Sequence, residues 1–152
     1  MSYEEIASYE SVFNDIKRVL EQGRRRAIAH VNHEMLVTYW NVGRIIVEHE
    51  QENPDRAEYG AATLKRLSRE LTETYGKGFS RSNLQNMRLL YLDYPICQTL
   101  SGKLSWSHYC ELLSISDPDK RRFYERECIE AGWSVRELKR QISTSLYERL
   151  IQ

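Results

Sequence analysis

The chain has 152 residues, of which 41% are apolar and 29% charged, a composition typical of one globular domain large enough to bury a core. Its 22 basic and 22 acidic residues cancel, which excludes binding to nucleic acid through overall charge and leaves only local patches for such a role. Three widely spaced cysteines exclude a disulfide framework and a zinc site. The absence of long apolar runs excludes a membrane span, so we expect a cytoplasmic protein.

The first third of the chain is predicted to form a long helical hairpin over residues 2–51. Ser2 and Glu5 have the spacing of a capping box that starts a helix. Gly23 is expected to end this helix, and a second one is expected from about Arg24 to Gln51. Within that second helix, Gly43 is expected to allow a close crossing with another helix. The buried side of the first helix is predicted from apolar residues at spacings of three and four: Ile6, Tyr9, Phe13, Ile16 and Leu20.

The segment between Thr63 and Pro95 has the pattern helix, tight turn, helix. It follows residues 51–60, where Pro54 interrupts the helical pattern. Gly76 and Gly78 permit a sharp reversal of the chain, and Ser80 can cap the second helix. The apolar sides are predicted to be Leu64, Leu67, Leu71 and Tyr75 in the first helix, and Leu84, Met87, Tyr91 and Tyr94 in the second.

The outward side of that second helix carries the side chains that bond to base edges and phosphates when a helix enters the major groove. A helix-turn-helix signature is weak, however, because any two adjacent helices of a bundle share it. DNA contact and ordinary bundle packing therefore both remain open at this point. The candidate DNA-binding residues on this helix are Arg81, Ser82, Asn83, Gln85, Asn86 and Arg88.

The rest of the chain predicts three more helices. Residues 95–103 are irregular and too short for a convincing extended hairpin, and Ser105 then caps a helix. Asp117 caps the next helix, which ends near Gly132. Ser134 and Glu137 have the spacing of a capping box, which is expected to start a last helix that continues to Leu150. The predicted fold is all-α, one domain of about seven helices over residues 1–152, with a helix-turn-helix-like part at 60–152.

Two further basic clusters are candidate phosphate contacts. Arg24, Arg25 and Arg26 stand where the second helix is expected to begin, a place where positive charge is unfavourable. Arg121 and Arg122 lie among acidic residues, a pattern that equally fits a solvated helix face. We therefore treat both clusters as auxiliary contacts.

No catalytic residue, metal site, cofactor or small-molecule substrate is predicted. Pro118-Asp119 and Glu137-Leu138-Lys139 match the string of a PD-(D/E)xK nuclease, whose acids and lysine must converge on magnesium from adjacent strands. Here both segments are predicted to be helical, so we interpret the match as coincidence.

The ordered segments resemble a known bacterial family. They include LSRELTETYGKGFS at 67–80, NLQNMRLLY at 83–91, LSWSHYCELL at 104–113 and RRFYERECIEAGWSVRELKRQI at 121–142. Nearly the whole chain is similar to the N-terminal domain of the YhcG-like nuclease family. The resemblance implies a helix-turn-helix DNA-binding part that precedes a C-terminal PD-(D/E)xK nuclease domain. The catalytic residues of the family lie in that second domain, which is absent here, so none is transferred to this chain.

The leading hypothesis is therefore a recognition domain for double-stranded DNA without catalytic activity of its own. The alternative is a dimerisation or protein-interaction module, because the apolar stripes of the N-terminal helices are long enough to pair with a second copy. An enzyme in its own right is the least favoured interpretation.

Overall fold

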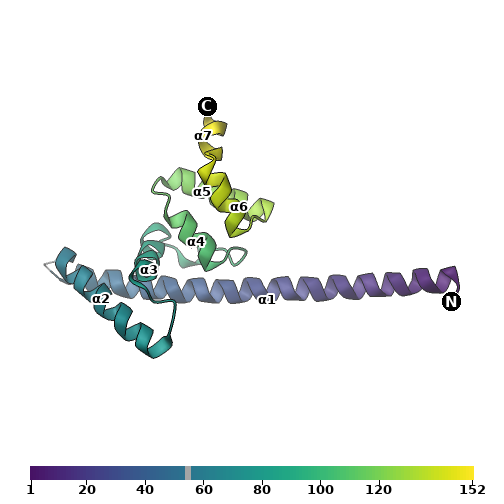
Figure 1. Ribbon diagram of the computed structural model, residues 1–152, viewed down its shortest axis with the longest axis horizontal. Helices are drawn as coiled ribbons and strands as arrows, with labels where there is room; N and C mark the ends of the chain where they lie inside the picture. Colours follow the sequence, from purple (N-terminus) through teal and green to yellow (C-terminus); the bar gives the residue numbers. More distant parts are fainter. Residues whose placement is uncertain (54–55) are drawn as a thin grey trace.

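The computed structural model describes the backbone of residues 1–53 and 56–152 and the side chains of residues 1–53 and 60–152. These residues form seven α-helices and one short 3-10 helix, η1, and contain no strand, which confirms the all-α prediction (Figure 1). The elements in chain order are α1 (Tyr3–Gln51), α2 (Arg56–Tyr75), α3 (Arg81–Asp93), η1 (Cys97–Thr99), α4 (Trp106–Leu113), α5 (Pro118–Ala131), α6 (Val135–Ser143) and α7 (Leu146–Ile151).

The predicted N-terminal hairpin is wrong, because residues 3–51 form one uninterrupted helix. Ser2 and Glu5 make the expected capping box at its start. Gly23 does not adopt a left-handed conformation and is followed by arginines and alanines, which are good helix formers. A single helical glycine costs only about 1 kcal/mol relative to alanine, which is too little to end a helix among such neighbours.

The two halves of α1 have different surroundings. Residues 3–28, which we call the arm, project away from the rest of the molecule (Figure 1). Residues 29–51 pack against the other helices, and together with them form what we call the body. In Figure 1, α3–α7 lie above this part of α1 and α2 extends below it. The body begins where the loop before α4 crosses α1. A Cβ atom on Gly102 would lie 2.3 Å from the carbonyl oxygen of Ala29, so only glycine allows this approach.

The centre of the body is the crossing of α1 with α3. A Cβ atom on Gly43 would lie 1.9 Å from the carbonyl oxygen of Met87, so the two helix backbones touch, as the sequence predicted for this glycine. Leu84, Met87 and Leu90 of α3 are fully buried. Helix α3 packs against α1, α2 and α4, which makes it the central helix of the body.

The last predicted helix is split into α6 and α7. Thr144 Oγ1 donates to the carbonyl oxygen of Arg140, and Ser145 has a left-handed backbone. Serine and threonine side chains compete with backbone hydrogen bonds in this way and so weaken a helix. The Tyr124 hydroxyl holds the break, because it donates to the Gln141 carbonyl at 3.3 Å and accepts from the Tyr147 amide at 3.1 Å. The predicted count of about seven helices is confirmed. The two helices expected over residues 2–51 are one helix, and the one expected at the end of the chain is two.

Other local predictions are confirmed. Ser80, Ser105 and Ser134 each cap a helix through the side-chain oxygen. Asp117 caps α5, and Gly132 ends it with a φ of 67°. Helix α2 begins at Arg56, earlier than expected, while Pro54 and its effect lie outside the described residues. Among the described helices, none is long and apolar enough to cross a membrane.

Candidate nucleic-acid interface

The turn between α2 and α3 forms as predicted. Gly76 and Gly78 have φ values of 86° and 108°, which only glycine adopts without strain. The Ser80 hydroxyl accepts from the Asn83 amide at 3.1 Å, and the Asn83 side chain donates to the Gly78 carbonyl at 3.2 Å. The turn and the first turn of α3 are therefore tied into one rigid unit.

Three polar side chains of this unit reach solvent freely. Lys77, Arg81 and Ser82 are exposed, and in the described part of the chain neither cation has an ion-pair partner. We call these three residues the α2–α3 tip. Since the tip surrounds the N-terminus of α3, its positive charges add to the positive end of the helix dipole. The tip can attract phosphate oxygens, and a serine hydroxyl can bond to them directly.

Arg88, by contrast, is committed within the protein. Its Nε lies 2.9 Å from Oε2 and 3.1 Å from Oε1 of Glu50 at the end of α1. Glu50 is only 13% exposed and Arg88 28%, so the pair is largely shielded from water. Arg88 therefore joins α3 to α1, and Gln85 lies beside it in the hollow between α1 and α2.

The two asparagines predicted on the outward side also face the protein. Asn83 binds back to the turn, and Asn86 contacts the Cys110 thiol on α4. Both are half-buried. The reason is that α3 is covered on three sides, so only its first turn remains for a partner.

The arginine cluster of α1 lies in the arm rather than at the tip. Arg24, Arg25 and Arg26 are exposed and follow one another inside a helix, so they point in three directions. The arm continues along the axis of α1 away from the body, whereas the α2–α3 turn lies below α1 within the body (Figure 1). The structure therefore does not bring these arginines together with Arg81.

Arg121 and Arg122 have different fates although they are adjacent. Arg121 is 7% exposed, and its guanidinium donates to the Ile115 carbonyl at 2.6 and 3.0 Å and pairs with Asp93 at 3.3 Å. The expectation that it is free for phosphate is therefore not met, because it is a buried group that joins α5 to the end of α3. Arg122 is exposed and pairs with Asp119 of its own helix.

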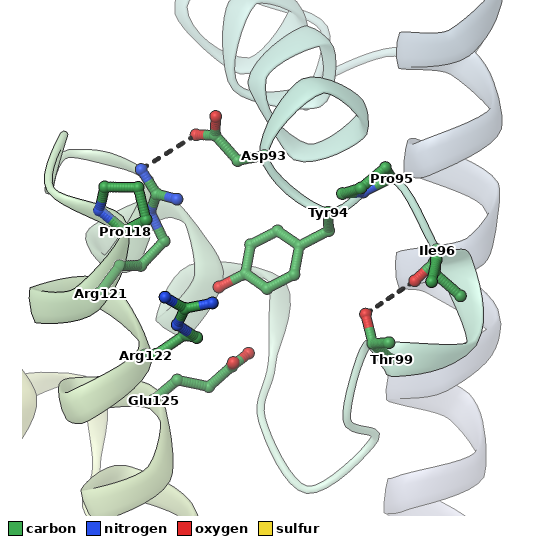
Figure 2. Close-up of a pocket in the computed structure, with 9 residues that line it drawn as sticks. All are labelled: Asp93, Tyr94, Pro95, Ile96, Thr99, Pro118, Arg121, Arg122 and Glu125. Atoms are coloured by element: carbon green, nitrogen blue, oxygen red, sulfur yellow. Dashed lines mark hydrogen bonds and ion pairs between the residues drawn. The ribbon is translucent and has the colours of Figure 1, made fainter.

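A half-buried carboxylate lies next to Arg121. Figure 2 shows the Tyr94 ring reaching toward Glu125 across a hollow of about 270 Å³. Burial raises the pKa of Glu125 above its usual 4.5, while the hydroxyls of Tyr109 and Tyr94 and the charge of Arg121 partly offset this. Burial also raises the pKa of Tyr94 and of Tyr109, so both stay protonated. These groups join α3, α4 and α5 and have the character of a structural cluster.

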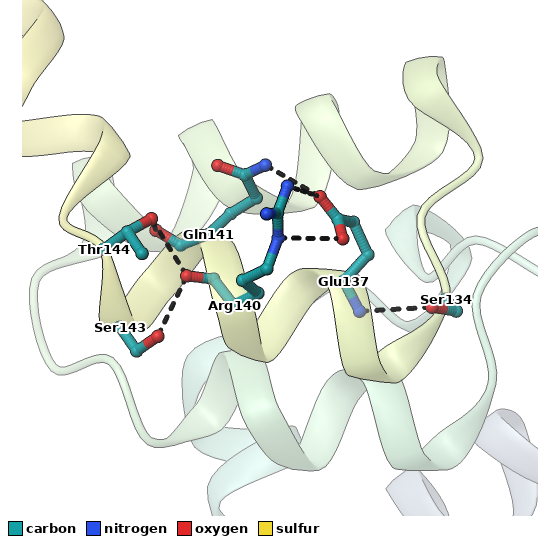
Figure 3. A network of polar contacts seen from close by, with 6 residues as sticks. All are labelled: Ser134, Glu137, Arg140, Gln141, Ser143 and Thr144. Carbon is teal, nitrogen blue, oxygen red and sulfur yellow. Dashed lines mark hydrogen bonds and ion pairs between the residues drawn. The ribbon is translucent and has the colours of Figure 1, made fainter.

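The nuclease-like string does not assemble a site. Asp119 pairs with Arg122, and Lys139 pairs with Glu111. Glu137 accepts from Arg140 and Gln141 of its own helix (Figure 3). The predicted capping box of Glu137 with Ser134 is therefore wrong, although Ser134 does cap the helix. Across residues 1–53 and 60–152, no three His, Cys, Asp or Glu side chains are grouped to hold a metal ion.

The cysteines are poor nucleophiles. Burial raises the pKa of Cys110 and of Cys128 to about 11, so both remain thiols near neutral pH. Burial also raises the pKa of Cys97. The thiols thus contribute packing rather than chemistry.

His108 is a structural residue that links two parts of the body. Its Nδ1 accepts from the Ser105 amide at 3.1 Å, so Nε2 carries the proton and donates to the Trp133 carbonyl at 2.8 Å. One imidazole thereby completes the cap of α4 and binds the turn between α5 and α6. The signal in the sequence was the serine three residues before it, a capping-box spacing with histidine in the place of glutamate.

Comparisons with known proteins identify the family of this chain. The family described as "DUF1016 N-terminal domain" matches residues 15–149. The chain is 38% identical, over 95% of its length, to "Putative nuclease YhcG" of Escherichia coli (strain K12), and it spans 47% of that protein. No solved structure is significantly similar to it. The chain therefore belongs to the DUF1016 N-terminal domain family.

Proposed function

We propose that this domain holds double-stranded DNA for a nuclease-type protein and contributes no cleaving chemistry. The observation that carries the proposal is the α2–α3 tip, where Lys77 and Arg81 are exposed without ion-pair partners at the start of α3. In helix-turn-helix proteins the N-terminal residues of the second helix reach the DNA. The tip offers that end of the helix.

The rigidity of α3 supports this role. The helix is held by the backbone contact at Gly43 and by the Arg88–Glu50 ion pair, so the tip does not have to be ordered when it binds. The interface is smaller than the one expected from the sequence, because it excludes Arg88, Asn83 and Asn86. It is made of phosphate contacts, which position a protein without selecting a sequence.

The relationship to a nuclease-type protein gives the proposal its context. The matched relative is named a nuclease, and this chain spans about half of its length. The described residues offer neither a metal-binding cluster nor a nucleophilic thiol. We infer a division of labour, in which this domain binds DNA and a different part of such a protein cuts it.

Binding to a short duplex at two salt concentrations tests the proposal. Lys77→Ala with Arg81→Ala should weaken binding about tenfold and lower the salt slope by roughly two, since two phosphate contacts are lost. Arg136→Ala is the matched control, because Arg136 is also exposed on a helix and unpaired within the described chain. Equal affinity of the double variant and the wild type would contradict the tip, and DNA cleavage by the purified chain with magnesium would contradict the division of labour.

A further inference from the structure

The arm of α1 carries an apolar stripe that contacts nothing. Ile6, Tyr9, Phe13, Ile16 and Leu20 are each between 42% and 66% exposed. Contiguous apolar surface of this kind on a soluble protein marks an interaction site. The spacing of these residues, alternately three and four, is that of the a and d positions of a coiled coil.

We propose that the arm pairs with the arm of a second copy of this chain as an antiparallel two-stranded coiled coil. The distribution of charge along the arm favours the antiparallel orientation. Every charged residue in positions 3–15 is acidic, whereas positions 17–26 contain five basic residues and one acidic one. Two antiparallel arms therefore place the acidic half of each beside the basic half of the other, which favours this pairing at every point along the seam.

The register of the apolar residues also fits an antiparallel pair. With Ile6, Phe13 and Leu20 at a positions, Tyr9, Ile16 and Gly23 occupy d positions. Antiparallel layers then match Phe13 with Ile16 of the other copy and Tyr9 with Leu20. All layers are apolar, and the small Gly23 faces Ile6 at each end.

The flanking positions agree with the same register. At the e positions Glu10 faces Lys17 of the other copy, and at the g positions Glu5 faces Arg26. The remaining g residues, Val12 and Val19, face each other and widen the apolar contact; they are 53% and 64% exposed in the single chain. A parallel pair would instead bring Glu5 beside Glu10 of the other copy, which is a like-charge contact.

The length of the arm allows this pairing without a clash between the two bodies. In this register the arms overlap around residues 14 and 15, so Ala29, where the body begins, lies just beyond the first residue of the other copy. The whole arm is paired and the two bodies lie at opposite ends, without overlap. A C2 axis relates the copies, as is usual for a homodimer.

The charges of the arm are free to make these contacts. Arg26 and Glu10 take part in no ion pair within the described residues, and Glu5 uses Oε2 in the capping box, which leaves Oε1 available. Lys17 contacts Glu21 at 4.0 Å with its side chain 60% exposed, a weak pair that can rearrange.

Sedimentation velocity of the 152-residue chain over a wide concentration range tests the proposal. The expected result is a reversible monomer–dimer equilibrium. Glu10→Lys should raise the dissociation constant about tenfold, since two attractive contacts become repulsive, and Glu10→Lys with Lys17→Glu should restore it. Glu4→Lys is the matched control, because residue 4 faces away from the seam and should leave the constant unchanged.

Cysteine cross-linking determines the orientation. Tyr9→Cys and Leu20→Cys variants, mixed and oxidised, should form the mixed disulfide, because these positions face each other only in the antiparallel register. The wild-type chain, oxidised in the same way, measures how much cross-linking its own three cysteines cause. Self-linking of the Tyr9→Cys variant alone would indicate a parallel pair and overturn the proposal. A chain that stays monomeric at all concentrations, or an arm covered by a different segment of a longer protein, would overturn it as well.

Discussion

The two halves of α1 share one helix and a similar apolar periodicity but have opposite fates. In the body half, Leu36, Ile46 and Val47 are buried, and α3 crosses so closely that the backbones touch at Gly43. In the arm half, no apolar side chain is buried. Apolar periodicity therefore identifies a face that needs a partner, but it does not say whether the partner lies in the same chain.

A glycine-to-alanine pair gives the largest expected contrast between the halves. Gly43→Ala places a Cβ atom 1.9 Å from the Met87 carbonyl oxygen, so α1 and α3 must separate. We expect a loss of roughly 2–4 kcal/mol in the free energy of unfolding. Gly23→Ala is the control in the arm, where a Cβ atom meets nothing within 4 Å, and it should be neutral or stabilising by up to about 1 kcal/mol. Urea denaturation measures both, and similar values for the two variants would contradict the difference between the halves.

Removal of an arginine should have an intermediate effect on the free energy of unfolding, and the effect should be larger in the body than in the arm. Arg88→Ala leaves the shielded Glu50 carboxylate without its partner, and we expect a loss of about 1–3 kcal/mol in the free energy of unfolding. Arg24→Ala in the arm should change it by less than about 0.5 kcal/mol. Thermal unfolding of both variants at low protein concentration checks this. If Arg88→Ala leaves the free energy of unfolding unchanged, Arg88 is again a candidate DNA contact.

The smallest expected effect is a pH dependence of stability that arises in the body, at Glu125. The folded state raises the pKa of Glu125 above 4.5, so it binds this proton more tightly than the unfolded state does. The stability from this group is present below pH 4.5 and is lost as the pH rises through the folded pKa. The Glu125→Gln variant has no carboxyl group to deprotonate at this position and does not lose this stability. The free energy of unfolding of the variant, relative to the wild type, should therefore increase between pH 4 and pH 7. Glu130→Gln, at an exposed position of the same helix, is the control. A difference between Glu125→Gln and wild type that does not change with pH would contradict the assignment.

Local signals in the sequence predicted local structure well. The caps at Ser80, Ser105 and Asp117 and the glycine turn before α3 formed as expected, because their hydrogen bonds join residues only a few positions apart. Gly43 was also assigned to a helix crossing. The errors at Gly23 and Thr144 concern whether a helix continues, which depends on small free-energy differences and on the distant Tyr124 hydroxyl.

The candidate interface was predicted less completely. Arg81 and Ser82 are exposed as expected, but no pattern in the sequence indicates that Arg88 meets Glu50, which lies 38 positions earlier. Arg121 looked like part of a surface run, yet it is held by the Ile115 carbonyl and Asp93. Pairing of charges across helices depends on tertiary packing, which periodicity does not report.

The continuity of α1 through Gly23 has a consequence for spacing. A helix rises 1.5 Å per residue, so in the proposed antiparallel pair the two α1–α3 crossings at Gly43 are held about 85 Å apart along the common axis. That is roughly the length of 25 base pairs of B-form DNA. A hinge at Gly23 would let the two bodies reach duplexes in many arrangements. An unbroken helix instead fixes the distance between the two bodies, so the dimer favours DNA contacts at one separation.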